Sequence, residues 1–256
     1  MMPVLFIGHG HPLNAIQNND FTAALTRAGG SLPRPESILV VSAHWLSRDG
    51  VAVSAAEQPE TLYDFGPFHP DLFRITYPAP GAPRPARRVA DLFPDPGARV
   101  DLRRGLDHGA WSVLLHLFPA ADIPVFQLSI DAGRPPRFHY DLARRLLPLR
   151  AEGVMIVGSG NIVHNLRRID WDDQRAPTED WAGSFDATAK DLIRKGLHED
   201  LIQYEQLEHA SAAVPTNDHY LPLLYALGAQ QPGETVEFLY EGFQYANISM
   251  RSLSIG

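Results

Sequence analysis

Four short apolar runs constrain the fold of this chain more than any other feature of its sequence. They lie at Val4–Ile7, Ile38–Val41, Val125–Ile130 and Val154–Val157. Each run is rich in branched or aromatic side chains and does not alternate with polar residues, as is typical of strands buried on both faces of a parallel sheet. Two later stretches, Thr235–Leu239 and Ile248–Ile255, are predicted to be further strands, added antiparallel at an edge.

Stretches with apolar residues at helical spacing separate these runs. We predict helices over Pro85–Phe93, Trp111–Phe118, Phe138–Leu149, Trp181–Leu197 and His219–Leu227. Strands that alternate with helices indicate an α/β fold, with a central, mostly parallel or mixed sheet flanked by helices. The composition does not change sharply anywhere, so residues 1–256 are expected to form a single domain.

A proline-rich segment, Tyr77–Pro96, holds six prolines and follows the motif TLYDFGPFHP. Long ordered loops in compact domains are often lids or binding loops. Together with that motif, the segment is equally well interpreted as a lid over a pocket or as a rigid connector.

Composition excludes several classes of function. The net charge of −8 argues against nucleic acid or an anionic membrane surface as a partner. No apolar run approaches the roughly 18 residues of a membrane span, and MMPVLFIGHG lacks the features of a signal peptide, so we expect a cytoplasmic protein. Because the chain has no cysteine, a metal ion would be held by imidazole, carboxylate or water, a ligand set that suits zinc or non-haem iron.

Histidines follow three of the predicted strands. His9 comes directly after the first run, His44 ends ILVVSAHW, and His164 closes GVMIVGSGNIVH. Ligands of open α/β sheets bind beyond the carboxyl ends of the strands. His9 lies between Gly8 and Gly10, which permit close backbone approach. The pattern predicts a shared metal or proton-transfer site at this edge.

Two more histidines lie at predicted turns or helix starts, His108 in GLDHGAW and His219 in PTNDHYLPLL. His108 is interpreted as a general acid or base, with Asp107 as a candidate to orient it. His219 is either a site residue or a packing residue at a helix start. His11 could face the same pocket as His9, and His69 could reach substrate from the proline-rich region.

The remaining histidines carry less weight. His116 is expected in the core or on the surface, and His139, His198 and His209 are expected to be exposed. Asp218 and Glu241 are candidate carboxylate ligands, but a helix cap or a surface charge explains each of them more simply. No HExxH zinc motif and no GxSxG nucleophile motif occurs.

An ordered set of motifs resembles a known family. The motifs are GHGHP, SAHW, DFGPF with YPAPG, GLDHGAW, IPVFQLSID, GSGNIVHNLR and PTNDHYLPLLYALGA. In this order they resemble the class III extradiol ring-cleaving dioxygenases, with the 4,5-DOPA extradiol dioxygenase-like subgroup the most similar. The resemblance extends from Pro3 to beyond Tyr225. Two motifs depart from it: HGSP reads HGHP, with His11 at the serine position, and DFGGFP reads DFGPFH.

The resemblance implies one divalent metal ion in each chain, Fe(II) for turnover or Zn(II) as bound. It implies His9 and His44 as ligands, with His164 and His219 completing or closely approaching the site. His108 matches a position of acid–base work, and His164 is either a ligand or the base. The two departures flank the pocket and bear on substrate identity, and His11 and His69 are taken as substrate-binding.

The implied reaction is the opening of a catechol ring next to its hydroxyl groups by O2, which gives a semialdehyde. The alternative is a zinc-dependent hydrolase that uses the same histidines, because zinc-bound water reaches a pKa near ~7. A third interpretation is a metal- or catechol-binding protein without turnover. The expected partners are a small catechol and O2, with the chain as a monomer or a small homo-oligomer.

Overall fold

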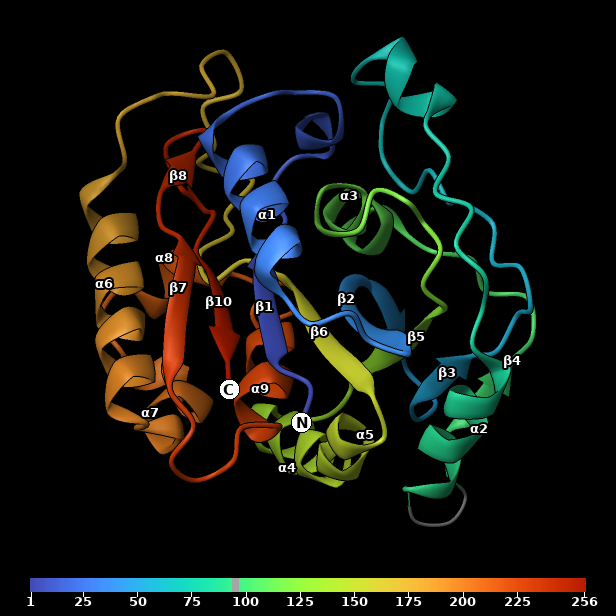
Figure 1. Ribbon diagram of the computed structural model, residues 1–256. Coiled ribbons are helices and arrows are strands. Elements are labelled where there is room, and N and C mark those ends of the chain that lie inside the picture. The colour runs from blue at the N-terminus through green and yellow to red at the C-terminus, as the bar shows by residue number, and fades with distance from the viewer. Residues whose placement is uncertain (94–96) are drawn as a thin grey trace.

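The computed structural model describes residues 1–93 and 97–256. Four parallel strands form the centre of its main sheet: β1 (Val4–Gly8), β2 (Ser37–Ser47), β5 (Val125–Asp131) and β6 (Val154–Gly160). The full order of the sheet is β4-β3-β5-β2-β6-β1-β10-β7 (Figure 1). The mixed α/β fold predicted from the sequence is therefore confirmed.

The outer strands are shorter and mostly antiparallel to the centre. They are β3 (Ala52–Ser54), β4 (Arg99–Asp101), β7 (Val236–Tyr240) and β10 (Ser252–Ile255). β10 pairs antiparallel with β1 on one side and with β7 on the other, and β3 pairs antiparallel with β5. A separate two-stranded ribbon joins β8 (Phe243–Gln244) to β9 (Ile248–Ser249).

Helices cover both faces of the sheet. They are α1 (Asp20–Ser31), α2 (Pro83–Asp91), α3 (His108–Leu117), α4 (Pro136–Arg145), α5 (Leu147–Ala151), α6 (Asp180–Lys195), α7 (His198–Ile202), α8 (Ala210–Ala213) and α9 (Leu221–Gly228). The short 3-10 turns are η1 (Pro12–Ala15), η2 (Pro70–Arg74) and η3 (Tyr204–Gln206). α1 and α3 pack on one face, and α4, α5, α6 and α9 pack on the other (Figure 1).

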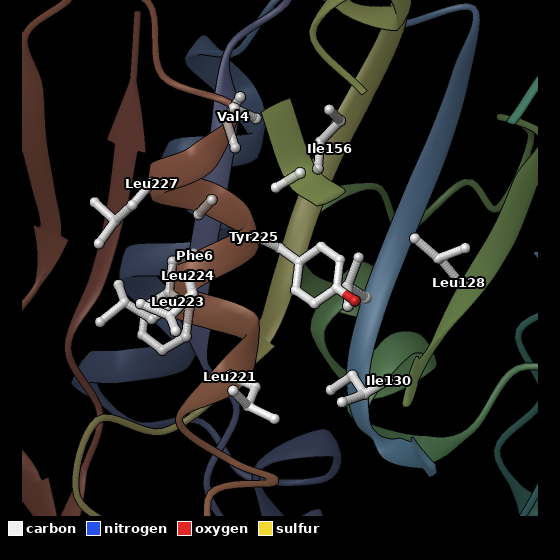
Figure 2. Packing of buried hydrophobic residues seen from close by; sticks show 14 of the residues in the cluster. Val4, Phe6, Leu128, Ile130, Ile156, Leu221, Leu223, Leu224, Tyr225 and Leu227 are labelled. Atoms are coloured by element: carbon white, nitrogen blue, oxygen red, sulfur yellow. The ribbon is translucent and has the colours of Figure 1, made fainter. Parts of the chain in front are cut away.

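Alternate residues of each central strand enter opposite cores. In β1, Val4 and Phe6 join the core under α9, whereas Leu5 and Ile7 join the core under α1 and α3. Figure 2 shows the first of these cores, with side chains of α9 packed against Phe6 and Ile156. Because both faces are buried, each strand is a continuous apolar run with no alternation, as the sequence indicates.

Two glycines of β6 let α9 approach the sheet closely. A Cβ on Gly158 would lie 2.3 Å from the Pro222 oxygen, and one on Gly160 would lie 2.1 Å from the His219 oxygen. The Asn161 amide donates to that same His219 oxygen at 2.8 Å. This packing fixes the backbone of His219 beside the carboxyl end of β6.

The structure differs from the prediction at several boundaries. The predicted helix Phe138–Leu149 is two helices, α4 and α5, and the predicted strand Ile248–Ile255 is divided into β9 and β10. α1 was not predicted, although Asn19 and Thr22 cap its start reciprocally through their side chains.

The proline-rich segment contains α2, which covers the predicted helix up to Asp91. Its residues 94–96 lie outside the described residues. None of its described residues lines the cavity beside the histidine cluster, but the preceding motif TLYDFGPFHP supplies Asp64, Phe65, Gly66 and Phe68 to the lining. The lid interpretation is therefore supported for that motif and not for the described part of Tyr77–Pro96. No helix in the described part of the chain is long and apolar enough to cross a membrane.

Candidate metal centre and active-site cavity

Five histidines from distant parts of the chain gather at one edge of the sheet. His9 follows β1, His108 is the first residue of α3, and His219 precedes α9. His164 lies in the loop after β6, and its amide donates to the Ala213 oxygen at 2.9 Å. His44 lies inside β2, where pairing with β5 is irregular between Val41 and Leu46, so the strand continues past the end that the sequence indicated.

His9, His44 and His219 each place a ring nitrogen within 4.8 Å of those of the other two. The Nε2 atoms of His9 and His44 lie 3.0 Å apart. A second group within the same limit joins His44, Asp64 and His108. The two groups share His44, so the described residues form one continuous cluster of metal-binding side chains.

Hydrogen bonds fix the tautomer of His9. The Ser159 hydroxyl donates to the Gly109 oxygen at 2.5 Å, so its oxygen accepts from Nδ1–H of His9 at 3.0 Å. The Nε2 atom of His9 then carries a lone pair that points at Nε2 of His44. Such an outer hydrogen bond is the usual way in which proteins orient a metal-binding imidazole.

His219 is held in the same manner. Its Nδ1–H donates to the carboxylate of Asp218, which leaves Nε2 free to bind a cation. Burial alone would raise the pKa of the Asp218 carboxyl, but the hydrogen bond and charge of His219 hold that pKa far below its usual value. The sequence singled out Asp218 as a candidate ligand, whereas here it orients a neighbouring imidazole.

Burial makes the central imidazoles neutral. It is the main reason why the pKa values of His9, His44 and His164 lie well below the usual value, and the neighbouring imidazoles lower them further. A metal ion binds the neutral imidazole. The chemistry of the donor set therefore fits a divalent cation between His9, His44 and His219.

Asp64, rather than Asp107, contacts and orients His108. The Asp64 carboxylate accepts from the His108 amide at 2.8 Å and lies 3.1 Å from its Nδ1, at an angle too bent for a regular hydrogen bond. Burial would raise the pKa of Asp64, but the hydrogen bonds and the imidazole of His108 lower it overall. Asp107 instead caps α3 and binds Ser42, Arg104 and Gln127.

His164 stacks on His219, with ring centroids 3.6 Å apart and planes 6° from parallel. It lines the cavity but belongs to neither group of close ring nitrogens. Of the two roles that the resemblance left open for His164, this placement favours a cavity-wall base over a ligand.

A cavity of about 200 Å³ opens over the cluster. Its floor is formed by the five histidines and Asp64, and its outer wall is mainly apolar and aromatic. His11 lines it, as expected. Burial lowers the pKa of His11 to about 4, so it is neutral at ordinary pH. His69 does not line the cavity: it is exposed and caps η2 by accepting from the Asp71 amide.

Outside the cavity, two histidines are placed differently from their predictions. His139 is fully buried, not exposed, and its Nδ1 is 3.0 Å from the Tyr225 hydroxyl oxygen. His198 is half-buried rather than exposed, whereas His209 is exposed as predicted. His116 binds the Asn14 oxygen through Nε2 at 2.9 Å. Glu241 pairs with Lys190 and Arg251 and takes no part in the cluster.

Sequence reasoning missed Asp64, Ser159 and the aromatic residues Phe68, Trp171 and Tyr245 that line the cavity. Asp64 begins the DFGPF motif, and an acid that precedes two aromatic residues was the available signal. Ser159 follows Gly158 inside β6 and carries no mark of its own in the sequence. Both act through neighbours that are distant along the chain, which only the fold reveals.

Known proteins resemble this chain over its whole length. It is 44% identical to a 4,5-DOPA dioxygenase extradiol of Escherichia coli (strain K12), with 100% of this chain and 95% of the relative covered. It is 37% identical to a protein of the same name from Portulaca grandiflora, with 96% and 93% covered. A relative of that name from Beta vulgaris is 35% identical, with 93% and 90% covered.

A solved structure has the same fold. The crystal structure of an uncharacterized protein from Escherichia coli K12 superposes with a TM-score of 0.87 at 41% identity, and each chain is covered completely. The family described as the catalytic LigB subunit of aromatic ring-opening dioxygenase matches residues 8–255. That range includes every histidine of the cluster. The chain belongs to this family of ring-opening dioxygenases, as the sequence motifs indicated.

Proposed function

We propose that this enzyme opens the ring of a DOPA-like catechol next to its hydroxyl groups, with Fe(II) held by His9, His44 and His219. The facing Nε2 atoms of His9 and His44, 3.0 Å apart, carry the proposal. Nε2 of His9 is an acceptor, so a cation between the two nitrogens would bind its lone pair together with that of His44 protonated at Nδ1. Without a cation, Nε2–H of His44 can donate to His9 instead. The names of the relatives support DOPA as the first substrate to test.

A bound Fe(II) would supply a site where catechol and O2 meet and exchange electrons. His9, His44 and His219 would hold the ion. The chain's own residues then hold the ring and move protons. Neutral ligands preserve the positive charge of the ion, which favours a deprotonated catechol hydroxyl.

His108 is proposed as the residue that takes a proton from the catechol. Its ring centroid lies 3.9 Å from that of His44 and 5.6 Å from that of His9, so it stands next to the proposed metal. Asp64 holds the amide of His108 and lies beside Nδ1, which leaves Nε2 to face the cavity. A well-placed acid or base contributes about 10²–10⁴-fold to a rate.

His164 is proposed as the second proton-transfer group. It is buried, lines the cavity and stacks on His219, so its ring is held against a proposed ligand without being one. From this position, His164 would return a proton to the reacting substrate after His108 has removed one. Two groups that differ in their neighbours suit two successive proton transfers.

The family match favours oxygen chemistry over the zinc hydrolase alternative. The test is anaerobic loading with Fe(II), followed by oxygen uptake with DOPA and other catechols. We expect uptake equal to substrate consumed and a new visible absorbance from a semialdehyde. Confirmed iron binding without uptake for any catechol would overturn the proposal.

A further inference from the structure

The outer wall of the cavity is a cluster of aromatic side chains from separate loops. The ring centroid of His11 lies 4.3 Å from Phe68, 5.5 Å from Tyr245 and 5.9 Å from Trp171. Phe68 and Trp171 lie nearly parallel, with centroids 6.4 Å apart. We call these four residues the aromatic wall. Their loops lie at the upper edge of the molecule in Figure 1.

The aromatic wall stands at the mouth of the cavity, whereas the metal-binding side chains form its floor. Trp171 is 51% exposed and Phe68 is 46% exposed, but His9 is only 3% exposed. A catechol whose hydroxyls reach the floor must direct the opposite end of its ring toward the mouth. The wall is therefore the surface that meets the substituent, or tail, of the substrate.

No lysine or arginine lines this cavity among the residues that the structure describes. Two nearby arginines are engaged elsewhere: Arg104 binds Asp107 at 2.9 Å, and Arg168 binds Glu179 at 2.9 Å. Arg167, next to Leu166 of the lining, is exposed and does not itself line the cavity. Nδ1 of His11 accepts from the Leu13 amide, so that atom carries no proton. The charged side chain in the described lining is Asp64, an acid. The donors that remain are neutral, Nε2–H of His11 and the Tyr245 hydroxyl, so a carboxylate in the tail would lose water and gain no cationic partner.

We propose that the aromatic wall selects substrates by the charge of the tail, accepting apolar and cationic tails and discriminating against carboxylate tails. Apolar tails gain contact with the wall, and ammonium groups gain attraction to the ring faces of Trp171 and Tyr245. This inference rests on the proposed function, because it places the catechol hydroxyls at the histidine cluster. It predicts that the ammonium of a DOPA-like tail contacts the protein and that its carboxylate stays in water.

The test compares four catechols with tails of similar length: 4-propylcatechol, dopamine, DOPA and 3-(3,4-dihydroxyphenyl)propanoate. Dissociation constants are measured by calorimetry without oxygen, and kcat/KM is measured with it. We expect the propanoate to bind about tenfold more weakly than propylcatechol and dopamine, because its carboxylate is desolvated without a cationic partner. Equal or tighter binding of the propanoate would overturn the proposal.

A matched pair of variants separates the wall from overall charge. Trp171→Arg places a cation in the wall and should improve propanoate binding relative to propylcatechol by about tenfold. Leu102→Arg adds the same charge at an exposed side chain outside the cavity and should leave that ratio unchanged. The proposal would be overturned if Trp171→Arg and Leu102→Arg changed the ratio of propanoate to propylcatechol binding equally. It would also be overturned if the protein preferred carboxylate tails and lost that preference in Arg167→Ala.

The two proposals fail differently. If no catechol supports oxygen uptake but the anaerobic binding order holds, the proposed reaction is wrong and the tail selection stands. If every catechol is opened with no order among the tails, the reaction stands and the tail selection is wrong. Trp171→Leu provides a second check, because it should weaken dopamine binding and leave propanoate binding unchanged.

Discussion

His9 and His44 face each other through their Nε2 atoms at 3.0 Å, and the hydrogen bond from His9 to Ser159 makes its Nε2 an acceptor. Buried polar atoms in native proteins are almost always satisfied. Without a metal ion, Nε2–H of a neutral His44 can donate to this acceptor, and a divalent cation would replace that hydrogen bond by binding both nitrogens. The hydrogen bond to Ser159 therefore orients His9 for the proposed metal centre.

The first prediction concerns metal content. His9→Ala and His44→Ala should each abolish tight binding of Fe(II), because each removes one of the three imidazole ligands. His69→Ala is the matched control, because His69 is exposed and outside the cavity, and it should bind metal normally. Metal content after dialysis is measured by mass spectrometry. Full occupancy in both ligand variants would contradict the assignment.

His108→Ala should retain the metal and lose turnover by about 10²–10⁴-fold, the contribution of a placed acid or base. Asp64→Asn should lower kcat by about tenfold and change KM little, because it disturbs the orientation of His108 rather than substrate binding. Metal analysis beside steady-state kinetics checks both variants. A loss of metal in His108→Ala would place His108 among the ligands instead.

Gly160→Ala should damage the metal site by way of the backbone. The added Cβ would meet the His219 oxygen at 2.1 Å, so the segment before α9 must move. We expect a loss of about 1–3 kcal/mol in the free energy of unfolding and weaker metal binding. Gly183→Ala is the control, because its Cβ meets nothing closer than 3.8 Å. Urea unfolding and metal titration of both variants decide the matter.

The buried His139 makes stability depend on pH. Burial lowers its pKa to about 4 in the folded protein, below the value of about 6.5 in the unfolded chain. Between these values the unfolded state binds the extra proton, so stability falls as the pH falls from about 6.5 to about 4. Near pH 5 the loss is on the order of 2 kcal/mol relative to neutral pH.

His139→Phe removes the proton uptake that causes this loss. Its free energy of unfolding should therefore change less between about pH 7.5 and about pH 5 than that of the original protein. Urea unfolding at the two pH values measures the difference. An identical pH dependence in the two proteins would show that His139 does not titrate differently on folding.

Much of the fold could be predicted because the central strands are buried on both faces. Burial of Val4 and Leu5 on opposite faces requires a continuous apolar run, which the sequence displays directly. α1 escaped prediction because its start is marked only by Asn19 and Thr22 and its interior contains two glycines. The division of the last predicted strand into β9 and β10 depends on partners far away in the chain.

The histidine cluster could be anticipated because His9 and His164 follow strands that lead to the same edge. The orientation of each histidine ring could not be anticipated from the sequence. Asp107 is next to His108 in the sequence, yet its carboxylate turns to Ser42 and Gln127, and Asp64 takes its place. His69 shares a motif with Phe68 but points outward, because the turn that it caps begins there.

The position of β10 between β1 and β7 has a consequence for synthesis of the chain. β1 leads directly to His9, and the second neighbour of β1 is supplied by Ser252–Ile255. Until those residues emerge from the ribosome, β1 has an open edge of the kind that pairs with other chains. The sheet is therefore incomplete until Ser252–Ile255 are available, and a chain without them should expose the edge of β1 to other chains.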